Sequence, residues 1–262
     1  MSSPRGISRP LSLARRWMCD LVWLSRTMPI AALEYRLQLQ PVIAAREASP
    51  HPHPSWVALF LKAFALVSRS RPAMRQGYFT FPWPRIYEHP ATVAAITVER
   101  EWRGENATFF DVLPDPETMG VMEIHHYLRR LKSEPVESFP SFRLMINGTR
   151  APLPIRRMIW RWLHSFSGPR RANYTGTFAI NGGGRFPVRP VEVTGVIGTT
   201  LYFGHFEPDG SVDACLAFDH RVMDGGEIIR TLGELEAVLN SDIVLELNAL
   251  ASAPAAPAVG SR

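Results

Sequence analysis

The alternation of apolar and polar residues is most regular in a short run near the end of the chain. The apolar side of this run is Val212, Ala214, Leu216 and Phe218, and the other side is Asp213, Cys215, Ala217 and Asp219. A period of two is typical of a strand with one buried face. After a turn through Gly225-Gly226, apolar residues recur at helical spacing at Ile228, Ile229, Leu232, Leu235 and Leu239. The pattern predicts a strand, a turn and a helix, with His220 and Asp224 in the turn.

The same criteria predict further elements along the chain. Helices are expected over 12–26, 57–67, 118–131 and 155–166, a hairpin over 78–87, and strands over 30–39, 92–99, 101–112, 191–197 and 199–206. The helix over 57–67 is apolar nearly all round, so we expect it between layers. We expect one folded domain over 12–247, a disordered basic tail over 1–11 and a disordered Ala/Pro tail over 248–262.

The helix expected over 155–166 is amphipathic and basic. Its apolar stripe is Ile155, Met158, Ile159, Trp162, Leu163 and Phe166, and the opposite side carries Arg156, Arg157 and Arg161. Such a helix can bind a membrane surface or a partner. The alternative, which we expect here, is that the stripe packs on its own domain and the arginines face water.

Composition and charge narrow the function classes. The hydrophobic fraction of 46% and the charged fraction of 20% are ordinary for a globular protein, and the net charge of +5 favours anionic partners. A high pI alone does not indicate nucleic-acid binding, and we expect none. No apolar run reaches the length of a membrane span, and no secretory signal is recognisable, so we expect a cytoplasmic protein.

The cysteines and histidines of the chain do not form the pattern of a metal site. Cys19 and Cys215 lie in apolar surroundings, which favours buried thiols in a reducing compartment, although a disulfide between them stays open. His51 and His53 alternate with prolines and have no carboxylate or cysteine nearby, which favours a plain loop. The adjacent His125 and His126 are expected to be solvated. We therefore expect no metal site.

His220 is the strongest candidate for chemistry. An imidazole titrates near neutral pH, and a backbone that holds it at the end of a strand suits a general base. The residues alone leave an alternative open, in which His220 and Asp224 only stabilise the turn and take no part in chemistry.

Two stretches carry a resemblance to a known family. Phe218-Asp219-His220-Arg221-Val222-Met223-Asp224-Gly225 resembles the FDHRVxDG signature of the acyltransferase component of 2-oxoacid dehydrogenase complexes, whose superfamily includes chloramphenicol acetyltransferase. Tyr174 to Phe186, which contains Thr177-Phe178-Ala179-Ile180-Asn181, is similar to the family's GGTFTISNLGxFG stretch. The resemblance implies an α/β fold, a two-layer sandwich with a mostly antiparallel mixed sheet covered by helices. Because it begins near residue 12, we expect a stand-alone, divergent member.

The resemblance also implies roles for the residues of the turn. His220 would remove a proton from a thiol or hydroxyl that attacks an acyl thioester of coenzyme A or a lipoyl group. Asp224 would support the turn with Gly225, paired with an arginine of the first helix, Arg15 or Arg16.

The family's oxyanion serine aligns with Asn181. An asparagine amide can donate to an oxyanion, and losing such a donor costs on the order of 10²–10³ in rate. Thr177 is a candidate substitute donor. Arg170 and Arg171 extend a positive patch and are candidates for binding the cofactor.

The family implies a homotrimer in which histidine and oxyanion donor come from different chains. Larger cages use contacts near the C-terminus, for which the candidates are Ile243, Val244, Leu245 and Leu247; burial in the trimer is the alternative. We expect an acyltransferase acting on a thiol, hydroxyl or amine acceptor. The alternative is a non-catalytic trimeric scaffold, or an assembly subunit of a dehydrogenase-type complex, that has lost the oxyanion serine. A membrane-surface contact is not favoured.

Overall fold

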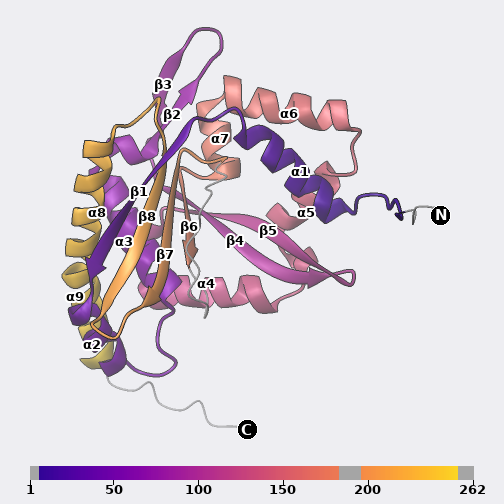
Figure 1. Ribbon diagram of the computed structural model, residues 1–262. Coiled ribbons are helices and arrows are strands. Elements are labelled where there is room, and N and C mark those ends of the chain that lie inside the picture. Colours follow the sequence, from indigo (N-terminus) through magenta and orange to yellow (C-terminus); the bar gives the residue numbers. More distant parts are fainter. Residues whose placement is uncertain (1–5, 183–195, 253–262) are drawn as a thin grey trace, which may run out of the picture.

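A six-stranded sheet forms the centre of the molecule (Figure 1). The computed structural model describes residues 6–182 and 196–252. Along the sheet the strands follow the order β1-β8-β7-β6-β4-β5. Their bounds are β1 Ile30–Gln38, β4 Val93–Trp102, β5 Glu105–Pro114, β6 Phe178–Gly182, β7 Thr199–Phe206 and β8 Ser211–Asp219. Strands β2 (Gln76–Phe79) and β3 (Arg85–Glu88) form a separate hairpin.

The sheet is mixed. Strands β1 and β8, β7 and β8, and β4 and β5 pair antiparallel, whereas β6 pairs parallel with both β4 and β7. The short β6 therefore joins the two antiparallel parts. The expected α/β sandwich with a mostly antiparallel mixed sheet is confirmed.

Helices cover one face of this sheet, and α3 lies at the centre of the core. Phe60 and Phe64 of α3 contact Phe203 and Phe178 of the sheet, with ring centroids 4.0 and 5.0 Å apart. The expectation that this helix is buried nearly all round is confirmed. The helices are α1 (Leu13–Ser25), α2 (Gln40–Ala48), α3 (Trp56–Ser70), α4 (Val121–Ser133), α5 (Pro140–Gly148), α6 (Leu153–Phe166), α7 (Gly168–Thr175), α8 (Gly225–Asn240) and α9 (Asp242–Ser252).

The other face of the sheet is mostly polar, apart from a small apolar cluster of Ala95, Ala179 and Ile197. Along β8 the predicted apolar side enters the core, while Asp213, Cys215 and Asp219 point the opposite way. On the same face, Glu34 and Arg36 of β1 are exposed. The alternation of apolar and polar residues along β8 therefore correctly predicts which face of the sheet the helices cover.

The predicted orientation of α6 is wrong for most of its residues, although Leu163 is buried and Arg157 and Arg161 are exposed as expected. Arg156 is 8% exposed, whereas apolar side chains that were expected inside lie at the surface. These are Ile155 at 45%, Met158 at 64%, Ile159 at 52%, Trp162 at 41% and Phe166 at 40%. The reason is a buried ion pair: Arg156 Nε and Nη2 donate to the Asp20 carboxylate of α1 at 2.6 and 3.2 Å. A buried carboxylate requires such a partner.

The C-terminal end of the structure also differs from the prediction, but less than α6 does. Helix α9 continues to Ser252, past the boundary expected at residue 247. Ile243 and Leu247 are buried within their own chain and Leu245 is 69% exposed, so these residues do not form one free anchor. The strand expected over 191–197 lies almost entirely outside the described residues.

Two expectations about single residues also change. Cys215 is buried but Cys19 is exposed, and both are free thiols. His126 is exposed, but His125 is 7% exposed and its Nδ1 accepts the backbone N–H of Ser55 at 3.0 Å. Within the two described segments, no helix has the length and apolar character needed to cross a bilayer.

The buried ion pair gives a prediction for stability. Asp20→Ala leaves Arg156 buried without a counter-charge and is expected to lower the free energy of unfolding by about 3–5 kcal/mol. Urea denaturation measures this change. The double variant Asp20→Leu/Arg156→Met should recover most of the loss. Glu134→Ala, which removes an exposed ion pair with Arg130, is the control, and an equal effect of both single variants would contradict the orientation of α6.

His125 gives a prediction for pH dependence. Burial lowers the pKa of His125, and the nearby charges of His126 and Arg129 act in the same direction. Since the folded pKa lies below the unfolded one, the unfolded chain binds the proton first as pH falls. Stability is therefore lost below about pH 6.5. The free energy of unfolding should fall between pH 7 and pH 5, and less steeply in His125→Gln; an unchanged slope beside the His126→Gln control would refute this.

Candidate active site

His220 follows directly on the last residue of β8. Its backbone N–H donates to the carbonyl of Pro29 at 3.1 Å, next to the point where Ile30 of β1 pairs with Asp219. The side chain is 54% exposed, and its ring centroid lies 5.5 Å from that of Phe218. The backbone is thus held by two strands while the imidazole faces solvent, as a base that meets a substrate requires.

The two neighbours of His220 form a clamp, by which we mean the side-chain pair of Asp219 and Arg221. Asp219 is fully buried, and its carboxylate accepts from Arg221 Nε at 2.9 Å and Nη2 at 2.6 Å. The backbone N–H of Arg221 also donates to it at 3.1 Å. Charge-assisted, bidentate bonds of this kind fix geometry strongly. The sequence pattern did not reveal the clamp to us, although an aspartate at the end of a largely apolar strand, two residues before an arginine, is a signal for it.

Asp224 lies beside His220 but not beside the arginines expected for it. Its Oδ1 is 3.6 Å from His220 Nδ1, and its side chain is 93% exposed. Arg16 Nε instead donates to the carbonyl of Leu11 at 3.3 Å, and Arg15 is exposed. The described ion pairs include none between Asp224 and either arginine. Gly225 begins α8, so Asp224 places a negative charge at the positive end of that helix.

Asn181 is held on the polar face of the sheet. Its Oδ1 accepts from the Thr97 hydroxyl at 2.7 Å, and its side chain also hydrogen-bonds Tyr202. Burial raises the pKa of Tyr202, and the bond with Asn181 opposes that shift. An amide nitrogen carries two protons, so these bonds do not use its whole donor capacity.

The strand register keeps Asn181 away from His220 in one chain. Asn181 is paired with Tyr202 and Tyr202 with Cys215, and His220 lies five residues further along (220 − 215). At about 3.3 Å per residue and 4.8 Å per strand, the two are about 16 Å apart along the strands and about 10 Å across them. A site that uses both residues needs two copies of the chain.

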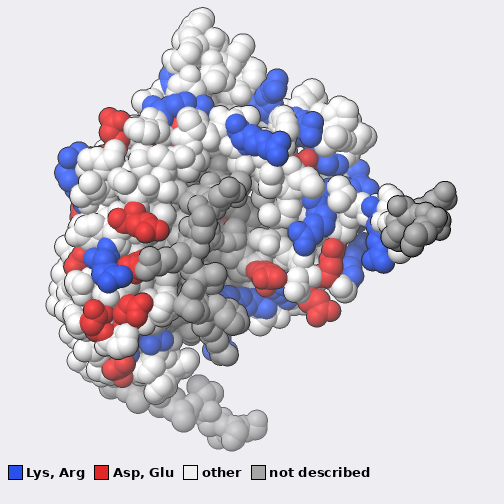
Figure 2. Space-filling model, viewed as in Figure 1, with Lys and Arg blue, Asp and Glu red and all other residues white. Residues whose placement is uncertain are grey.

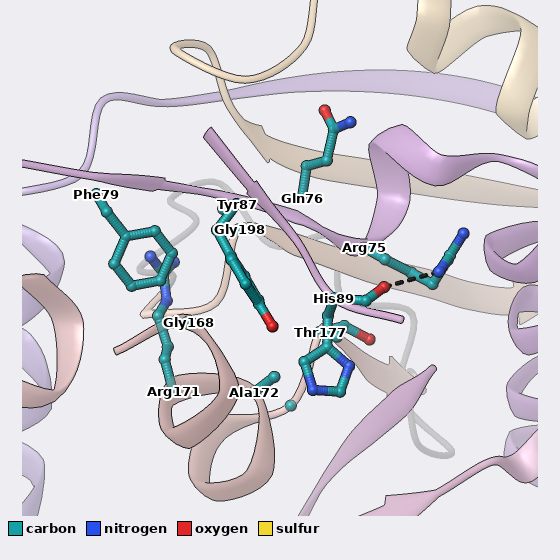
Figure 3. A pocket seen from close by; sticks show the side chains of 12 residues that line it. Arg75, Gln76, Phe79, Tyr87, His89, Gly168, Arg171, Ala172, Thr177 and Gly198 are labelled. Carbon is teal, nitrogen blue, oxygen red and sulfur yellow. Dashed lines mark hydrogen bonds between the residues drawn. The ribbon is translucent and has the colours of Figure 1, made fainter. Parts of the chain in front are cut away.

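Thr177 does not offer a free donor. Its hydroxyl donates to the carbonyl of Val93 at 3.2 Å and accepts the Val93 N–H at 3.0 Å. A hydroxyl has one proton, so the one in Thr177 is already used to join β6 to β4. Thr177 also lines the small pocket of Figure 3, whose volume of about 30 Å³ suits a water or two and not a substrate.

Arg170 and Arg171 are in different environments. Arg170 is exposed, with its guanidinium 4.8 Å from the ring centre of Trp162. Arg171 is 7% exposed, donates to the carbonyl of Tyr78 at 3.1 Å and lies over Phe79 at 5.3 Å (Figure 3). Burial lowers the pKa of Arg171 to about 10, which still leaves it charged at neutral pH. Of the two arginines expected to bind the cofactor, Arg170 therefore carries an exposed charge and Arg171 a buried one.

No family model matches the sequence. No curated protein matches it either. The similarity to known proteins is one of fold.

Several solved structures share nearly the whole fold. A probable dihydrolipoamide acetyltransferase from Listeria monocytogenes is 15% identical with a TM-score of 0.62, covering 96% of this chain and 98% of its own. Dihydrolipoamide acetyltransferase from Azotobacter vinelandii is 14% identical with a TM-score of 0.63, covering 92% and 94%. The cubic core of the pyruvate dehydrogenase multienzyme complex is 14% identical with a TM-score of 0.61, over the same shares.

These structures agree in architecture while their sequences have diverged. At such low identity the similarity is one of fold. The chain has the fold of the catalytic cores of the dihydrolipoamide acetyltransferases of 2-oxoacid dehydrogenase complexes, as the residues around His220 and Asn181 indicated.

Proposed function

We propose that this protein is an acyltransferase that uses His220 as its general base. The observation that carries the proposal is the imidazole itself. It is half exposed, its backbone is bonded to Pro29, and the clamp fixes the residues on either side. The fold shared with acetyltransferase cores supports the same reading.

The contact with Asp224 suggests which ring nitrogen is the base. A proton on Nδ1 would face the carboxylate, which leaves Nε2 unprotonated toward the substrate. In the Azotobacter acetyltransferase, a histidine and an asparagine four positions later were studied for their roles in catalysis. His220 and Asp224 have that spacing.

The reaction that fits is acyl transfer from a thioester. Nε2 removes the proton of a thiol, hydroxyl or amine, and the resulting nucleophile attacks the thioester carbonyl. A tetrahedral oxyanion forms, and its collapse expels a thiolate that takes the proton back from the imidazolium. Coenzyme A or a lipoyl group is the proposed thiol carrier, and the exposed Arg170 is a candidate to bind an anionic group of the cofactor.

Asn181 of a neighbouring copy is the proposed oxyanion donor. The register excludes the Asn181 of the same chain, and the amide has protons beyond its described bonds. A homotrimer would bring the two residues together, and the shared fold with a cubic core supports assembly of this kind. Larger cages are consistent with the same fold.

A non-catalytic scaffold is the second candidate. The observation that favours it is that Asn181 is tied to Thr97 and Tyr202 where the family has a serine. A scaffold would need the assembly but not the imidazole. Activity of single variants therefore separates the two functions.

Two variants test the proposal. His220→Ala is expected to reduce acetyl transfer from acetyl-coenzyme A to dihydrolipoamide by on the order of 10²–10⁴, and Asn181→Ala by on the order of 10²–10³. Because each site would take one residue from each of two copies, refolding the variants together should restore about a quarter of wild-type activity. Turnover of the mixture measures the restoration.

The matched control is His205→Ala, which removes an exposed histidine of β7. It should leave turnover and assembly unchanged. Wild-type turnover that survives His220→Ala would rule out the base, and two inactive variants that stay inactive when mixed would rule out a site shared between copies.

A further inference from the structure

A cavity of about 150 Å³ lies beside the turn that carries His220. Its walls come from the end of α1, strand β2, helices α6 and α7, and the residue after His220. Trp23, Leu24 and Met28 form an apolar side. Arg161, Arg171 and Arg221 contribute three guanidinium groups, and no acidic residue is among the lining residues.

The positive charge in this cavity exceeds the negative charge beside it, because Arg171 and Arg221 share the one carboxylate of Asp219. Arg221 is neutralised by Asp219 in the clamp. Neither Arg161 nor Arg171 makes an ion pair with a described carboxylate, and Arg171 is almost fully buried. A buried guanidinium that shares its counter-charge with a second guanidinium is costly, and a bound anion would lower that cost.

His164 provides a second, independent observation. It also lines the cavity, and its Nε2 is buried with no hydrogen-bond partner among the described residues. Burial and the charge of Arg171 hold its pKa well below the usual value, so the ring is neutral at pH 7. A buried polar nitrogen without a partner is destabilising, and a ligand oxygen would satisfy it.

The size and apolar wall define the rest of the ligand. A cavity of about 150 Å³ accommodates a molecule the size of benzene. We propose that this cavity binds the carboxylate or phosphate group of a small molecule whose apolar part lies against Trp23, Leu24 and Met28.

The position of the cavity connects it to His220. Thr27 and Met28, which line it, directly precede Pro29, whose carbonyl holds the His220 backbone, and Arg221 directly follows His220. The cavity would therefore anchor an anionic substrate, either acyl donor or acceptor, next to the base. This last step rests on the proposed function, whereas anion binding itself does not.

The melting temperature of the full chain tests anion binding. Inorganic phosphate and butyrate are titrated against chloride at constant ionic strength. A ligand bound to the folded state raises the melting temperature with its concentration. We expect this rise in wild type, an affinity weakened about tenfold or more in Arg161→Gln, and no rise in Arg171→Met. Arg161 is exposed on α6, so its variant is informative even if Arg171→Met does not fold.

Arg129→Gln is the matched control, because Arg129 is an exposed arginine of α4 outside the cavity. It should behave as wild type. A response to phosphate alone or to butyrate alone identifies the group that binds. No response to either anion, or equal weakening in Arg161→Gln and Arg129→Gln, overturns the inference. His220→Ala should keep the response while it loses acyl transfer. A wild-type chain that binds the anion but transfers no acyl group would refute the proposed function and not this site.

Discussion

The ion pair between the buried Asp219 and the partly exposed Arg221 is the interaction on which the rest of the site depends. It fixes the residues on both sides of His220 with two charge-assisted bonds, both shorter than 3.0 Å. The guanidinium also lies over the ring of Tyr78 at 4.4 Å, which links the end of β8 to the β2–β3 hairpin. A carboxylate that is fully buried would be strongly destabilising without this partner. The same pair therefore fixes the chain on both sides of the imidazole, and its Arg221 lines one side of the arginine-lined cavity.

The sheet adds a second constraint, which separates the groups needed for acyl transfer. The clamp holds His220 at the end of β8, while Asn181 lies several residues away along β6 and two strands across. Neither can move toward the other without breaking the strand pairing. A chain with this register can perform the proposed chemistry only as an assembly.

The surface is also unevenly charged: Figure 2 shows Lys and Arg side chains around the hairpin and α6, and most acidic side chains elsewhere on that face.

Much of this could be predicted from the sequence, because it depends on local pattern. The period of two over 212–218 gave β8 and its buried face, and the helical stripe after Gly225 gave α8. The eight residues from Phe218 indicated the fold that the structural comparison confirms. The sequence pattern was sufficient to predict those elements whose structure is determined by residues close together in the chain.

The errors came from partners far apart in the chain. The orientation of α6 depends on Arg156 meeting Asp20, 136 residues away, and the hydroxyl of Thr177 is used by Val93, 84 residues away. Apolar periodicity does not contain such pairings, so it favoured burying Trp162 and exposing Arg156. The expected pairing of Asp224 with Arg15 or Arg16 failed for the same reason. Both arginines lie on α1, and the buried charge of that helix is Asp20, whose partner is far away in the sequence.

The most direct measurement is an experimental structure of the assembled protein, which gives the distance between His220 Nε2 of one copy and Asn181 Nδ2 of its neighbour. We predict a separation of about 8 Å or less across the interface, which lets both groups reach one reacting carbonyl. A chain that stays monomeric, or an assembly that leaves the polar face of the sheet and His220 uncovered by a neighbour, would contradict the proposed active site.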